Sequence, residues 1–155
     1  MPGTDLMPLE GWDHVELWVG NAKQAAYWYE HALGFERVAY AGPETGVRDR
    51  ASYVLEQGEI RLVLTSGLRG DSPIAAFAAR HGDGAKNIAL RVPDARAAFE
   101  IAVERGAAPV GEPHVLEDEH GRVQLATIKT YGEVVHTFVE RADYAGPYLP
   151  GYVSL

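Results

Sequence analysis

Residues 13–34 read DHVELWVGNAKQAAYWYEHALG, and this stretch decides the fold. Its first seven residues alternate between apolar and polar types and are rich in β-formers, which predicts a strand. Asn21 is of a type that caps helices, and apolar residues then recur at helical spacing as far as Gly34. Glycine is common directly after a helix. The stretch therefore predicts a strand followed at once by an amphipathic helix.

The same pattern continues along the chain. After the helix, β-forming runs separated by glycine-containing turns predict three strands, at residues 35–40, 51–57 and 60–65. A short helix follows over residues 72–80, because Ser72 and Pro73 are suited to its first positions. The order of strand, helix and three strands then returns, at residues 87–92, 94–106, 108–115, 123–130 and 134–140.

Matching residues connect the two halves. Leu17 recurs as Leu90, and the tripeptide GEI at residues 58–60 recurs as GEV at residues 132–134. A shared order of elements together with matching residues indicates an internal duplication. One such module leaves a sheet face bare, and two modules can curve around a shared space. We therefore predict an α+β fold of two tandem βαβββ modules that form a curved mixed sheet.

This pattern divides the chain into five segments. Residues 1–10 predict a flexible N-terminal arm, and residues 11–66 and 85–141 are the two modules. Residues 67–84 hold the short helix and a linker. Residues 142–155 are rich in Pro, Gly and Tyr and have no periodic pattern, so we expect a C-terminal extension that links to a catalytic domain outside this chain.

Composition narrows the function classes. A chain of 155 residues, 46% apolar and 23% charged, suits a globular domain, and its apolar runs are too short for a membrane span. The absence of cysteine excludes disulfides, thiolate metal sites and cysteine nucleophiles. A net charge of -8 without a Lys/Arg stripe argues against a nucleic-acid partner. We expect a cytoplasmic protein.

Seven stretches carry a resemblance to a known family. They are residues 19–26 (VGNAKQAA), 51–55 (ASYVL), 62–66 (LVLTS), 81–84 (HGDG), 92–98 (VPDARAA), 131–137 (YGEVVHT) and 146–152 (GPYLPGY). In order and spacing they resemble the vicinal oxygen chelate superfamily of glyoxalase I, extradiol dioxygenases and bleomycin-resistance proteins. Within it, the chain is most similar to the N-terminal half of the 4-hydroxyphenylpyruvate dioxygenase and 4-hydroxymandelate synthase family.

The resemblance implies a specific chemistry. Enzymes of this family use non-haem Fe(II), dioxygen and an aromatic 2-oxo acid, and the dioxygenases form homogentisate in tyrosine catabolism. Two histidines and one carboxylate hold the iron and leave positions open for substrate and oxygen. The resemblance places these ligands in a C-terminal half that this chain lacks. We therefore expect a non-catalytic N-terminal domain that packs against a catalytic domain, of the same protein or another subunit, within a homo-oligomer such as a dimer.

The positions of this chain that correspond to the family's ligands hold a different set of residues. They are His14, Asn87, His136 and Leu62, which include no carboxylate. Glu16 lies two residues from His14 on the same strand face and could supply one. His14 and His136, with Glu16, are therefore the candidate metal ligands, and the alternative is that both histidines are structural.

Two other functions remain open. One is a free-standing protein of the bleomycin-resistance type that binds a small molecule without catalysis. The other is a free-standing vicinal oxygen chelate metalloenzyme that uses His14, Glu16 and His136. No Ser-His-Asp or paired-carboxylate arrangement predicts another catalytic group. The run Tyr27-Trp28-Tyr29 covers more than one helix face, so we expect at least one of these rings to be exposed or to be buried against another domain or subunit.

Overall fold

The computed structural model describes residues 6–155. These residues form nine strands, three α-helices and one 3-10 turn. In chain order the elements are β1 (Gly11–Trp18), α1 (Ala22–Leu33), β2 (Glu36–Ala41), η1 (Pro43–Thr45), β3 (Arg50–Gln57), β4 (Ile60–Gly67), α2 (Pro73–His81), β5 (Gly84–Arg91), α3 (Ala95–Glu104), β6 (Pro109–Asp118), β7 (Gly121–Lys129), β8 (Val135–Glu140) and β9 (Val153–Ser154).

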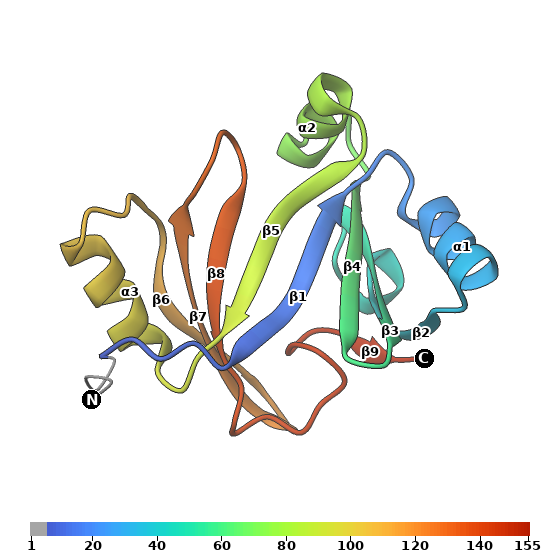
Figure 1. The fold of residues 1–155 in the computed structure, drawn as a ribbon. Coiled ribbons are helices and arrows are strands. Elements are labelled where there is room, and N and C mark those ends of the chain that lie inside the picture. The colour runs from blue at the N-terminus through green and yellow to red at the C-terminus, as the bar shows by residue number, and fades with distance from the viewer. Residues whose placement is uncertain (1–5) are drawn as a thin grey trace. The chain divides into compact units, whose positions relative to one another are not determined.

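The chain folds into two compact units, each built on one βαβββ module (Figure 1). The module-1 unit contains His14–Lys86 together with Pro147–Leu155. The module-2 unit contains Asn87–Gly146 and the described residues before His14. The predicted duplication is confirmed, because β1, α1 and β2–β4 repeat in order as β5, α3 and β6–β8.

Helix α1 of the module-1 unit begins and ends where the sequence predicts. The Asn21 Oδ1 atom accepts a hydrogen bond from the Gln24 amide at 3.0 Å and so satisfies a free N–H of the first turn. Gly34 ends the helix with a φ of 77°, a left-handed conformation that favours glycine. The helix packs on one face of a sheet of order β1-β4-β3-β2-β9. Its core contains Ala26, Phe35, Leu55 and Leu64.

The opposite face of the module-1 sheet is covered by the C-terminal segment, defined here as residues 147–155. Tyr148 packs against Ala39, Val54 and Val63 and is only 3% exposed. Strand β9 then pairs antiparallel with β2, so the chain ends beside this sheet (Figure 1). Residues 142–155, which the sequence predicts as an extension, therefore include a segment that packs within the module-1 unit.

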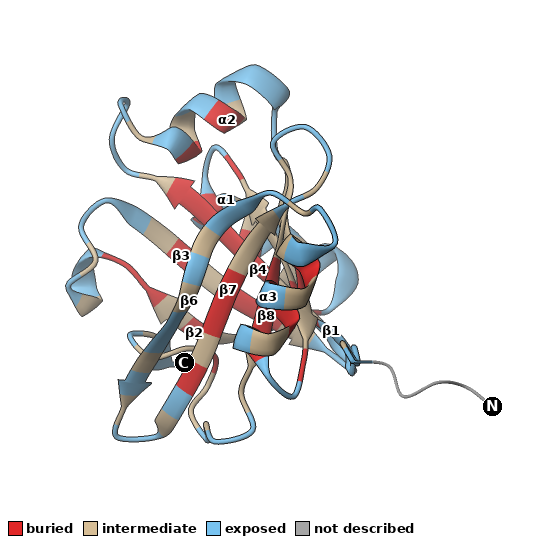
Figure 2. Cartoon of the chain, turned by 90° about the vertical axis from the view of Figure 1, so that its left-hand side faces the viewer, coloured by how far each residue is buried: buried red, intermediate tan, exposed pale blue. Residues whose placement is uncertain are grey.

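The module-2 unit repeats the arrangement of sheet and helix. Its strands lie in the order β6-β7-β8-β5, and Phe99 of α3 packs in one cluster with Ala126 and Phe138 of the sheet. Val123, Leu125 and Ala126 of β7 are buried. Figure 2 shows the buried parts of β7 in red. Strand β6 lies at the edge of this sheet, as its prolines at positions 109 and 113 predict.

A buried ion cluster joins the start of β1 to the end of β8. The Asp13 side chain is fully buried, and its carboxylate accepts hydrogen bonds from Arg141 Nε at 2.6 Å and Arg141 Nη2 at 2.9 Å. Arg91 reaches the same carboxylate at 3.2 Å. A carboxylate buried this deeply requires such partners, because its desolvation is otherwise expensive.

Other sequence expectations are resolved by the fold. Tyr27 and Trp28 are both exposed on α1, as the aromatic run predicts. The predicted arm of residues 1–10 is described from residue 6, and Met7 packs against the α3 cluster. Residues 1–5 lie outside the described residues. Within residues 6–155, no helix has the length and apolarity needed to cross a membrane.

Substituting Asp13 with asparagine is expected to destabilise the chain strongly. The change removes the negative charge that two arginines share and should lower the free energy of unfolding by about 3 kcal/mol. Urea unfolding measures this loss. Asp71→Asn is the matched control, because its pair with Arg69 is exposed and should contribute less than about 1 kcal/mol. If the two substitutions lowered the free energy of unfolding equally, the Asp13 ion cluster would not have the stabilising role described here.

Candidate functional site

The sheet face beneath the C-terminal segment holds two of the predicted metal ligands. His14 and Glu16 lie two residues apart on β1 and therefore share this face. His14 is buried, and its Nε2 atom is 2.9 Å from the Tyr148 hydroxyl. The Tyr148 ring meets the imidazole edge-on, with a centroid distance of 5.1 Å. His14 is thus engaged by a side chain of the C-terminal segment.

A series of hydroxyl hydrogen bonds, each donated in the same direction, ends at the Glu16 carboxylate. The Tyr152 hydroxyl donates to Ser52 Oγ at 2.8 Å, and Thr65 Oγ1 donates to Glu16 Oε2 at 2.8 Å. Ser52 Oγ and Thr65 Oγ1 are also 2.8 Å apart. Because Thr65 has a single hydroxyl hydrogen, Ser52 is the donor in this central bond. Hydrogen bonds in such a series polarise and strengthen one another.

The phenol at the head of this series stays protonated. Burial raises the pKa of Tyr152 to about 12, and the negative charge of Glu16 adds to the rise. Tyr152 therefore remains a donor over the whole neutral range. This series of hydroxyl hydrogen bonds has a fixed direction and delivers its last hydrogen to Glu16 Oε2.

In the module-2 unit, the corresponding positions are divided between two sheet faces. Asn87 donates from Nδ2 to Thr137 Oγ1 at 2.8 Å, so these two residues share one face. His136 precedes Thr137 on β8 and therefore points to the other face. It lies opposite Ile128, which packs in the α3 cluster, and its Nδ1 atom is 2.8 Å from the Ile88 carbonyl oxygen. Asn87 and His136 do not share a face.

The described residues contain no group of three His, Asp or Glu side chains that could hold a metal ion. Leu62, the fourth corresponding position, packs in the apolar cluster under α1. The surroundings of His14, Glu16, Asn87 and His136 are therefore hydrogen-bonding networks, and they do not fit an iron centre with two histidines and a carboxylate.

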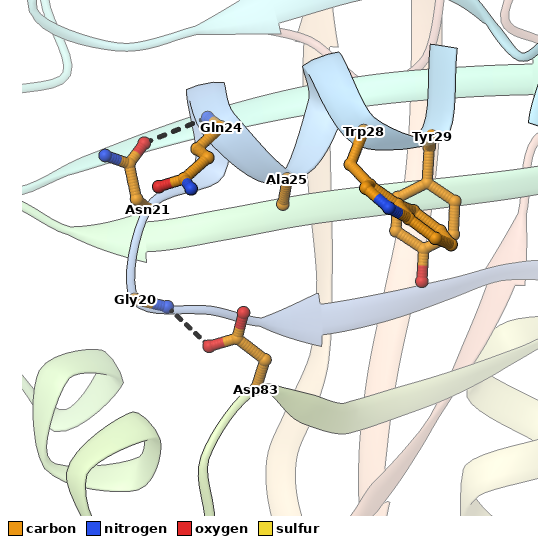
Figure 3. A pocket seen from close by; sticks show the side chains of 7 residues that line it. All are labelled: Gly20, Asn21, Gln24, Ala25, Trp28, Tyr29 and Asp83. Carbon is orange, nitrogen blue, oxygen red and sulfur yellow. Dashed lines mark hydrogen bonds between the residues drawn. The ribbon is translucent and has the colours of Figure 1, made fainter. Parts of the chain in front are cut away.

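A cavity of about 530 Å³ opens beside the start of α1 (Figure 3). Its lining residues are Gly20, Asn21, Gln24, Ala25, Trp28, Tyr29 and Asp83. The Gly20 amide donates to Asp83 Oδ1 at 2.8 Å and so holds the carboxylate at the cavity rim. The Trp28 and Tyr29 rings meet edge-on at 5.0 Å and form an aromatic wall. An aromatic wall beside a carboxylate suits a small ligand with an apolar and a hydrogen-bond-donating end.

Comparison with known proteins shows to which family this chain belongs. Residues 4–148 match the sequence family described as "Hydroxyphenylpyruvate dioxygenase, HPPD, N-terminal". The chain belongs to this family. A 4-hydroxyphenylpyruvate dioxygenase from Dictyostelium discoideum is 50% identical over 146 residues, which cover 93% of this chain and 40% of that protein. The enzyme from Coccidioides posadasii is 44% identical over 162 residues, which cover 96% of this chain and 41% of that protein.

Solved structures show the same fold. A variant of 4-hydroxymandelate synthase from Streptomyces coelicolor matches with a TM-score of 0.84 and 33% identity, covering 96% of this chain and 43% of that one. Methylmalonyl-CoA epimerase from Mycobacterium tuberculosis matches with a TM-score of 0.69 and 26% identity, covering 92% of this chain and 93% of that one. This hydroxyphenylpyruvate dioxygenase N-terminal domain thus has the expected vicinal oxygen chelate fold. It spans about 40% of the length of the curated dioxygenases it matches.

Sequence reasoning about the domain missed the partners of its candidate ligands. Tyr148 and Tyr152 were not identified as site residues, although both face the module-1 sheet. One signal was available for Ser52, because alternation along residues 51–57 places it on the same face as Val54. No local signal links Tyr148 to His14, which lies 134 residues away.

Replacing Thr65 with valine should interrupt the series of hydroxyl hydrogen bonds while nearly preserving the shape of the side chain. Both Ser52 and Glu16 lose a hydrogen-bond partner, and we expect unfolding to become easier by about 1–3 kcal/mol. Thermal or urea unfolding measures the effect. Ser154→Ala, which alters an exposed hydroxyl on β9, should change stability by less than about 0.5 kcal/mol. A Thr65→Val variant as stable as this control would show that the hydroxyl hydrogen bonds contribute nothing to the stability of the fold.

Proposed function

We propose that this chain is the non-catalytic N-terminal domain of a 4-hydroxyphenylpyruvate dioxygenase-like Fe(II) enzyme. One observation carries the proposal: the match covers nearly all of this chain but only 40% of the relative from Dictyostelium discoideum. The remaining part of such a relative is long enough for a second domain of similar size. In this proposal that part holds the iron and the reacting atoms.

The contacts of the candidate ligands support the proposal that this domain does not hold the iron. His14 is engaged by Tyr148 and Glu16 by Thr65, while His136 lies on the α3 side of its sheet. An iron ion at His14 and Glu16 would compete with the buried hydrogen bond between His14 and Tyr148 and with the part-buried bond from Thr65 to Glu16. In this proposal no reaction step takes place on this chain.

The wider setting follows from the family. We propose that the complete protein acts on an aromatic 2-oxo acid and dioxygen, with homogentisate as product and tyrosine catabolism as context. We further propose a homo-oligomer, such as a dimer, in the cytoplasm. The exposed rings Tyr27 and Trp28 on α1 are suited to a contact with the catalytic domain or another subunit. The choice between dioxygenase and mandelate synthase depends on the catalytic half.

Metal analysis and oxygen uptake test the proposal. The purified chain, supplied with Fe(II) and 4-hydroxyphenylpyruvate, should consume no more oxygen than an iron-only blank and should retain far less than one iron per chain. The physical reason is the lack of a three-ligand group among the described residues.

The same measurements on His14→Ala and His136→Ala variants complete the test. In this proposal neither variant changes iron content or oxygen uptake. Stoichiometric iron that is lost in either variant would overturn it and favour the metalloenzyme alternative with His14, Glu16 and His136.

The cavity beside α1 favours one alternative, a small-molecule-binding protein of the bleomycin-resistance type. Its volume lies within the range of known ligand sites, and its lining combines rings with a carboxylate. In that case a screen of small aromatic amines should raise the melting temperature of the chain. Asp83→Asn, which keeps an acceptor for the Gly20 amide, should abolish the shift. Asp71→Asn is the control, and no shift in any variant would exclude this binding role.

A further inference from the structure

The surroundings of the Tyr148 side chain have the composition of a ligand site. Ala39, Val54 and Val63 form an apolar wall against the ring. The Arg61 guanidinium lies 5.7 Å from the ring centroid, at cation–π distance, and the Tyr152 ring meets it edge-on at 4.8 Å. The His14 Nε2 atom lies 2.9 Å from the hydroxyl. Apolar walls with a few placed polar groups are typical of pockets for small aromatic molecules.

We propose that this face of the module-1 sheet is a binding site for phenols, which the chain fills with its own Tyr148. The proposal does not depend on the proposed function of the domain, because it rests only on contacts within the module-1 unit. The ligand class follows from the contacts: a single six-membered aromatic ring with one hydroxyl that reaches His14.

The last residues of the C-terminal segment are held more weakly than Tyr148, which is buried. Beyond Tyr152, β9 pairs with β2 through two residue pairs, and the Leu155 amide donates to the Val38 carbonyl at 3.0 Å. The residues of β9 are themselves exposed. Segments with few buried contacts open locally at much lower free energy than the whole fold. The Tyr148 ring itself is buried, so removing it by substitution makes the sheet face beneath it available to an external phenol.

A bond to His14 should distinguish phenols from plain aromatic rings. A phenol hydroxyl restores the hydrogen bond at Nε2, whereas a methylbenzene offers the same ring without it. Sites built to bind a hydroxyl discriminate strongly against analogues that lack one. The contrast between p-cresol, which is the tyrosine side chain as a free molecule, and toluene therefore reports on this contact.

The experiment uses Tyr148→Ala in the full 155-residue chain. The substitution should lower the melting temperature, because it empties a buried ring site. Millimolar p-cresol should raise the melting temperature of this variant by several degrees, more than toluene does, and should leave the unsubstituted chain nearly unchanged. Should the variant be unfolded alone, p-cresol should restore its far-UV circular dichroism and toluene should not.

Two controls separate the phenol site from a simple cavity. Phe138→Ala opens a buried site in the apolar α3 cluster, where p-cresol should have no advantage over toluene. Tyr148→Phe keeps the ring in place, so neither compound should shift its melting temperature. The proposal is overturned when p-cresol stabilises or refolds Tyr148→Ala no better than toluene, or stabilises the unsubstituted chain equally well.

Discussion

The contact between Tyr148 and His14 is the constraint on which the module-1 unit depends. One face of the module-1 sheet packs under α1, and the other face presents Ala39, Val54 and Val63 and needs a second cover. Here the C-terminal segment covers it and brings a phenol to a histidine 134 residues earlier in the chain. The first strand and the last residues of the chain are thereby fixed in one core.

This packing also sets the surroundings of the candidate metal ligands His14 and Glu16. His14 and Glu16 share a strand face, and their hydrogen-bonding atoms meet Tyr148 and Thr65. The fold is thus shared with enzymes such as the epimerase, whereas function depends on which side chains remain available. In this domain the same face packs against the C-terminal segment, and we propose that the dioxygenase chemistry belongs to the remainder of the protein.

Local signals predicted much of the fold. Asn21 and Gly34 bound α1 as their residue types suggest, and Ser72 and Asp94 cap α2 and α3. The duplicated order of elements was also visible in the sequence. The candidate site depends on which side chains share a sheet face, and this is not visible in a short stretch of sequence. A difference of one residue on β8 changes the sheet face, and Thr137, next to His136, is the residue that meets Asn87.

The sequence by itself determined the βαβββ repeat, the helix ends and the family, because capping, periodicity and motif order are properties of short stretches of chain. Only the tertiary structure decided which side chains face one another. It placed Tyr148 on His14, linked Tyr152 to Glu16 through two hydroxyls, and put His136 on the α3 side of its sheet. These outcomes depend on strand register and on the return of a distant segment, and neither is encoded in any local pattern.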